Sequence, residues 1–265
     1  MTSEVRPLEN GWLPDTPVED SLLRKFLCNQ SDAQAELALA VGGRCERTPD
    51  VVLTDLGIPE PMLNQAVLLR PLSGPDDPVL EVVAKFFRGA QGSLLSAWPT
   101  PDLAGRGWQL VGHPMFVARG AWQQPPAIFP GVDVRVAASA ADLALAERLA
   151  VDGYPMPELD GLPPNSMFGP ALVDGPMTHR IGCVDGQPVG AAAAYVAHGV
   201  VNLCFAATLP AARRRGVWQS LVAARCSDAP ELPAMAFTSD YSRPGFIRLG
   251  FLPLWRATFW AVASG

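Results

Sequence analysis

Hydrophobic residues in the first half of the chain alternate between helical and strand-like spacing. The segment 31–43, SDAQAELALAVGG, has helical spacing, with Ser31 as its predicted N-cap, Gln34 completing a capping box and two glycines as its end. Apolar runs predict strands at 51–56, 65–72 and 93–98, a helix at 78–89, and a bent strand pair at 107–119. Strands that alternate with helices indicate an α/β arrangement.

The second half repeats this pattern more clearly. A strand at 132–136 precedes a helix at 139–153, which Ser139 is expected to cap. A long Pro- and Gly-rich loop follows at 154–170, which is long enough to be a substrate lid. Further elements are expected as strands at 200–208, 234–239 and 251–262, and as helices at 216–226 and 243–250.

The segment 179–199 predicts a β-hairpin. Two apolar runs flank Asp185-Gly186, a dipeptide that favours a tight hairpin turn. The run Ala191–Ala194 has helical propensity, but the turns on either side leave too little room for an isolated helix. We therefore predict a strand there. A cluster of Pro and Gly at 120–131 marks the boundary between the two halves.

Composition excludes several classes of protein. The net charge of −6 argues against general binding to nucleic acid or to an anionic membrane. No segment approaches the apolar length of a membrane span, and the N-terminal residues do not resemble a signal peptide, so we expect a cytoplasmic protein. Five scattered cysteines and three histidines show no metal-ligand spacing, so no metal site is expected.

One basic cluster stands out in this acidic chain. Arg213, Arg214 and Arg215 precede Gly216 at a junction between a predicted strand and a predicted helix. The first backbone N–H groups of a helix have no partner within it and bind anions, and arginine adds donors that suit phosphate oxygens. Gly216 would let a diphosphate approach the backbone. No nucleoside-triphosphate or dinucleotide fingerprint is present, so another diphosphate carrier is indicated.

On these residues the second half resembles the GCN5-related N-acetyltransferase family. Pro210, Arg213 and Gly216 match its R/Q-x-x-G-x-G/A motif, whereas Trp218 stands where the family has Gly or Ala. The string IRLGF, 247–251, resembles the late L-G-F element of the family. The resemblance implies an acetyl-CoA-dependent N-acyltransferase that acts on a small-molecule or peptide amine; a non-catalytic acyl-CoA-binding protein is the alternative, and a scaffold without CoA is a third.

The resemblance also implies which residues hold acetyl-CoA. The strand end would pair with the pantetheine arm, the arginine loop would hold the diphosphate, and two further residues would line the site: Phe205, Ala206, Ala207, Thr208; Arg213, Arg214, Arg215, Gly216, Val217, Trp218; Ser239 and Phe246. Acidic residues in and after the long loop, Glu158, Asp160 and Asp174, suggest a cationic acceptor.

Acyl transfer needs a base for the amine and a proton donor for the thiolate. Phe246 occupies the position at which the family often has a donor tyrosine, so Tyr241 is the predicted substitute. His198 is the predicted base, with Asp240 and Asn202 left open as alternatives. A solvated surface role is the plainer interpretation of both Tyr241 and His198.

The two halves also resemble each other. Gly107-Trp108 aligns with Gly250-Phe251, and the same offset of 143 brings Phe116 onto Phe259. We therefore expect two similar domains, residues 1–125 and 130–265, each a mixed, mainly antiparallel twisted sheet flanked by helices, in a mixed α+β chain. The first would be a degenerate copy that helps wall the acceptor pocket, and a homodimer is compatible with this arrangement.

Overall fold

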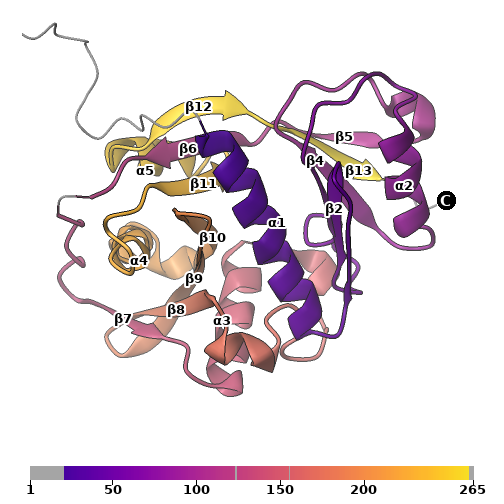
Figure 1. Ribbon diagram of the computed structural model, residues 1–265. Coiled ribbons are helices and arrows are strands. Elements are labelled where there is room, and N and C mark those ends of the chain that lie inside the picture. The colour runs from indigo at the N-terminus through magenta and orange to yellow at the C-terminus, as the bar shows by residue number, and fades with distance from the viewer. Residues whose placement is uncertain (1–20, 123, 155, 263–265) are drawn as a thin grey trace, which may run out of the picture.

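A computed structural model describes residues 21–122, 124–154 and 156–262 (Figure 1). The α-helices of this part are α1 (Leu22–Ala40), α2 (Pro78–Phe86), α3 (Ala140–Gly153), α4 (Val217–Cys226) and α5 (Arg243–Arg248). The strands of the first half are β1 (Arg44–Arg47), β2 (Val51–Asp55), β3 (Gln65–Leu68), β4 (Gly92–Ser96), β5 (Gln109–Gly112) and β6 (Met115–Arg119). Those of the second are β7 (Val132–Val136), β8 (Met177–Val184), β9 (Gln187–Ala197), β10 (Val200–Thr208), β11 (Ala234–Thr238), β12 (Leu252–Arg256) and β13 (Thr258–Val262).

These strands form two mixed, mainly antiparallel sheets with the same layout, except that the second has an additional edge strand, β7. The first has the order β1-β2-β3-β4-β13-β5 and the second β12-β6-β11-β10-β9-β8-β7. Each contains one parallel pair, β3 with β4 and β10 with β11. The expected mixed α/β fold class is therefore confirmed.

Each half of the chain lends one strand to the sheet of the other half. Strand β6 lies between β11 and β12 in the second sheet, and β13 lies between β4 and β5 in the first. In Figure 1 the yellow end of the chain runs from β12 across to β13 beside β4. The single strand predicted at 251–262 is thus two strands that separate at Ala257 and enter different sheets.

The exchange keeps the sequence offset of 143. The two exchanged strands start at Met115 and Thr258, and 258 − 115 = 143. Gly107 and Gly250 both have positive φ, of 78° and 81°. The proposed boundary between 125 and 130 lies in the link from β6 to β7, but β6 and β13 pair across it, so neither sheet is built from one half alone. The division into two domains stays a prediction.

Helix α1 begins nine residues before the predicted N-cap. Leu22, Phe26 and Leu27 extend the buried stripe toward the N-terminus, so the helix continues through Ser31. The Ser31 hydroxyl donates to the Leu27 carbonyl at 2.7 Å, one turn back in the same helix. The predicted capping box is therefore wrong, whereas the predicted end at Gly42, with φ of 75°, is correct.

Buried amides connect α1 to both sheets. Asn202 on β10 donates to the Gln30 side chain at 3.0 Å, and Gln30 donates to Gln65 on β3 at 3.0 Å. Figure 1 shows α1 running between the two sheets. Because all three side chains are at least nine-tenths buried, this chain of hydrogen bonds ties the halves in one relative position.

The second sheet is covered by a helix on each face. Ala191 and Ala193 of β9 pack toward α3, and Val201 and Leu203 of β10 pack toward α4. The alanine run is a strand, as predicted, because it pairs with β8 on one side and β10 on the other. No helix in the described part of the chain is long and apolar enough to cross a membrane.

Candidate functional site

The second sheet opens between its parallel strands. Strands β10 and β11 pair only at Val201 with Ala234 and at Asn202 with Met235. Beyond that point β10 carries a bulge between Cys204 and Ala207. Although β10 lies in the middle of the sheet, residues 204–206 are only partly buried. Unpaired backbone in a central strand leaves room for an extended ligand between β10 and β11.

The loop after β10 presents a row of free backbone donors. The N–H groups of residues 214–219 have no hydrogen-bond acceptor among the residues that the structure describes. The first helical bond of α4 runs from the Ser220 N–H to the Gly216 carbonyl at 2.9 Å. The positive end of the α4 dipole therefore faces this loop, and free N–H donors beside a helix N-terminus are chemically suited to an anion.

The three arginines of the loop have different roles. Arg213 is exposed but donates to the carbonyls of Thr208 (3.3 Å) and Gly153 (3.0 Å), so its guanidinium ties the loop to β10 and to the end of α3. Arg215 pairs with Asp185 of the β8–β9 turn at 2.9 Å. Arg214 is exposed, has a φ of 63°, and has no partner in the described chain. Of the three arginines, Arg214 is the one whose side chain forms no hydrogen bond or ion pair within the described residues.

Gly216 is needed for a reason that the sequence did not reveal. Its φ is 81°, and a Cβ there would overlap the ring of Phe129, which comes from the link between the halves. The Phe129 N–H donates to the Ser220 hydroxyl at 2.9 Å, which fixes the ring over the loop. The space beside Gly216 is thus filled by an aromatic ring, and a diphosphate would meet the loop from its N–H side.

Trp218 departs from the family motif without covering the loop. Its ring packs on Phe246 of α5, with centroids 4.8 Å apart, and against Gly245, where a Cβ would approach it to 2.8 Å. Phe246 is buried between Trp218 and Phe251, so it belongs to the core. Ser239, at the start of the turn into α5, accepts a hydrogen bond from the Ser242 N–H. Phe246 therefore packs on α4, and Ser239 bonds within the turn that leads into α5; neither belongs to the arginine loop.

The structure does not bring the two predicted catalytic residues together. Tyr241 follows β11 and its side chain is 98% exposed. His198 lies in the turn before β10, and its Nε2 is 2.6 Å from Asp32 on α1. The β10 strand separates His198 from the arginine loop by roughly 25 Å. Asp240 pairs with Arg243 and Arg256 at the surface.

One buried histidine was missed in the sequence. His179 on β8 is 2% exposed, both of its ring nitrogens lack a hydrogen-bond partner in the described chain, and burial lowers its pKa to about 4. Its ring lies 4.3 Å from that of Phe168, which reaches Phe205 in the bulge at 5.6 Å. The alternation of Met177, His179 and Ile181 along β8 is the signal that could have placed it inside.

The first half closes the equivalent loop with its own carboxylate. Asp77 precedes α2, which follows the parallel strand β3 as α4 follows β10. Its carboxylate accepts from the Val79 and Ser73 N–H groups, the Ser73 hydroxyl and both Nη atoms of Arg70. An internal anion already occupies this helix N-terminus. Only the second half therefore leaves the loop open, in the described chain.

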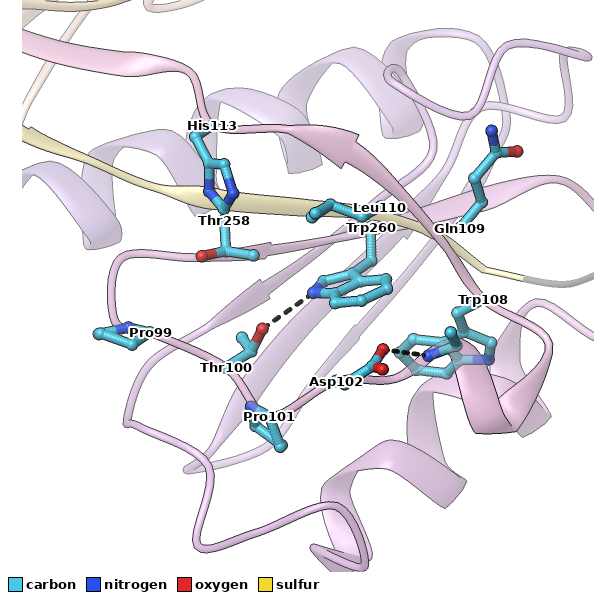
Figure 2. A pocket seen from close by; sticks show the side chains of 11 residues that line it. Pro99, Thr100, Pro101, Asp102, Trp108, Gln109, Leu110, His113, Thr258 and Trp260 are labelled. Atoms are coloured by element: carbon cyan, nitrogen blue, oxygen red, sulfur yellow. Dashed lines mark hydrogen bonds between the residues drawn. The ribbon is translucent and has the colours of Figure 1, made fainter.

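A hollow of about 680 Å³ lies on the first sheet, away from this loop. Figure 2 shows Trp108 and Trp260 along one wall and Pro99 and Pro101 opposite, with the Trp260 indole bonded to Thr100 at 2.9 Å. In the second half, α5 covers Phe251, the residue equivalent to Trp108. The hollow contains none of the predicted site residues.

No protein-family model matches the chain, and no curated protein matches it by sequence. Solved structures match it over most of its length. A GCN5-related N-acetyltransferase from Kribbella flavida has a TM-score of 0.63 at 22% identity, covering 90% of this chain and 96% of its own. The chain has the GCN5-related N-acetyltransferase fold.

Two further structures agree with this fold. A functionally unknown conserved protein from Staphylococcus epidermidis has a TM-score of 0.61 at 12% identity, covering 84% of this chain and 94% of its own. A GNAT-family protein from Novosphingobium aromaticivorans has a TM-score of 0.54 at 14% identity, covering 89% and 96%. The matches extend over both halves, and the resemblance first seen in the arginine loop is confirmed at the level of the fold.

Proposed function

We propose that the protein is an acyl-CoA-dependent N-acyltransferase that moves an acetyl group from acetyl-CoA to an amine. The observation that supports this most is the row of free N–H groups at 214–219 beside the gap between β10 and β11. A diphosphate suits the row of donors, and an extended amide-containing arm suits the open strand edge. Coenzyme A joins these two chemical groups in one molecule.

The dimensions of the gap agree with this ligand. A pantetheine arm has about 15 chain atoms, the length of roughly five extended residues. Counted back along β10, the five residues that start with Thr208 end at Cys204, at the edge of the bulge and two residues from Asn202, where β10 pairs with β11. A diphosphate in the loop would therefore place the thioester beside Cys204, where the sheet opens.

The reaction forms one bond and breaks one. The neutral amine nitrogen attacks the thioester carbonyl carbon, the C–S bond breaks, the nitrogen loses a proton, and CoA leaves as a thiolate that takes one up. An alkyl ammonium has a pKa near about 10, so the amine must lose a proton before it attacks. Burial raises the pKa of the Cys204 thiol to about 12, so this cysteine is not the base.

Binding of acetyl-CoA tests the proposal directly. Isothermal titration should show micromolar affinity for acetyl-CoA and none for adenosine, which lacks the diphosphate. Arg214→Glu should weaken acetyl-CoA binding about tenfold or more, because it places a carboxylate beside the phosphates. Arg88→Glu, which makes the same charge change at an exposed site of the first half, is the matched control and should bind like the wild type. Equal affinities of the two variants would contradict the proposed site.

A second candidate function is acyl-CoA binding without catalysis. Its support is the lack of a placed proton donor, since Phe246 is apolar and Tyr241 points into solvent. Release of free CoA thiol with a panel of primary amines separates the two functions. Tight binding without release for any amine would favour the non-catalytic alternative.

A further inference from the structure

Arg225 on α4 is a buried charge, and within the described residues it has no ion-pair partner. Its side chain is fully buried. Nε donates to the Leu221 carbonyl at 3.0 Å, and Nη1 donates to the carbonyls of Ala193 (2.9 Å) and Cys204 (3.2 Å). Nη2 is buried and has no acceptor in the described chain.

Such an arrangement costs stability. A buried charge without an opposite charge is expensive even when some of its donors are satisfied, and an apolar side chain of similar volume avoids the cost. Burial lowers the pKa of Arg225 to about 10, so the group stays charged at neutral pH. The neighbouring Arg180, by contrast, is neutralised in the usual way by an ion pair, with Asp228.

The Arg225 guanidinium lies at the start of the β10 bulge. Its Nη1 binds the two carbonyls at the last regular pair before the β10 bulge, Ala193 with Cys204. The next residue, Phe205, has a φ of 51°, a strained value for an aromatic residue. The guanidinium thus braces the segment at which the thioester is expected, and a positive charge there favours negative charge on the acyl oxygen.

We infer that Arg225 is a positioning residue for acyl transfer, which holds the β10 bulge in shape and directs positive charge toward the acyl group. The inference rests on the proposed function, because it needs CoA to lie along β10. It predicts that the site prefers a negatively charged group at the acyl position.

Carboxymethyl-CoA, a stable thioether with a carboxylate at the acyl position, tests this preference without knowledge of the acceptor. By titration calorimetry the wild type should bind carboxymethyl-CoA about tenfold more tightly than CoA. Arg225→Met should bring the ratio of the two affinities to about one, while Arg225→Lys should keep most of the preference. Arg180→Met is the matched control: it removes a neighbouring arginine and should leave the ratio unchanged.

The ratio separates a functional role from a structural one. If Arg225 only supported the fold, its replacement would lower the melting temperature or weaken both ligands equally, and the ratio would survive. A wild type that binds CoA without preferring the carboxylate would overturn the inference even if no variant folds, and would leave the proposed function intact. A wild type that binds neither ligand would instead refute the proposed function.

Discussion

Replacement of Asp77 tests whether the first half fills its own helix N-terminus. The carboxylate is 2% exposed and accepts hydrogen bonds from Arg70, Ser73 and Val79, at 2.7 to 3.0 Å. Asp77→Asn keeps the shape but removes the charge and leaves Arg70 with Asp50 alone. Asp77 is buried but the Arg70 side chain is 35% exposed, so the loss of the charge costs about 2 kcal/mol, less than in a fully buried ion pair. The melting temperature should therefore fall by roughly 4 to 8 °C.

The pH dependence of this effect has a defined sign. Hydrogen bonds from Arg70 above all hold the pKa of Asp77 well below its usual range in the folded protein. The contribution of Asp77 to stability is therefore present above about pH 4 and is lost progressively below it. The difference in unfolding free energy between wild type and Asp77→Asn should shrink by about 1 kcal/mol from pH 5 to pH 3.

The control for Asp77 is another acidic cap in the same half. Asp102 also accepts from a backbone N–H, that of Ala104 at 2.9 Å, but it is exposed and has no arginine partner in the described chain. Asp102→Asn should change the unfolding free energy by less than about 1 kcal/mol. Thermal melts of both variants test this. The reasoning would be refuted if the two variants lost the same melting temperature, or if the difference between wild type and Asp77→Asn were as large at pH 3 as at pH 5.

Two further substitutions test buried and exposed groups of the second half. His179→Leu should stabilise the protein, since it removes two unpartnered ring nitrogens from the core; the gain in melting temperature should grow as the pH falls from 6.5 toward 4, because the unfolded chain binds a proton there that the folded histidine refuses. A gain that is independent of pH would contradict the burial of a neutral ring. Tyr241→Phe should leave turnover unchanged, because the hydroxyl is in solvent. A loss of about 100-fold would show that Tyr241 moves into the site as proton donor.

The sequence predicted local elements well because their signals are local. Asp185 and Gly186 have φ of 52° and 73°, as the hairpin turn requires, and Ser139 caps α3 by accepting from the Asp142 N–H. The exchange of β6 and β13 could not be predicted in this way. Both segments are apolar strands whichever sheet they join, and only long-range pairing decides between the sheets.

The helix N-terminus at the candidate site was predicted in position, but the contacts of the side chains around it were not. The string RRRG marks a helix N-terminus correctly, yet whether an arginine faces solvent or backbone depends on neighbours far along the chain, such as Gly153 and Asp185. Phe129 and Arg225 carry no motif at all. Each acts through a contact with a segment distant in sequence, so neither could be found by spacing.

The first half contributes to the structure of the second sheet although its own helix N-terminus is occupied by Asp77. It supplies β6, which is paired on both sides in the second sheet. It also supplies Gln30, whose amide holds Asn202 at the vertex of the gap between β10 and β11. The strand and the buried amide have structural roles that do not depend on a bound ligand. The first half therefore helps to determine the geometry of the second sheet without binding a ligand itself.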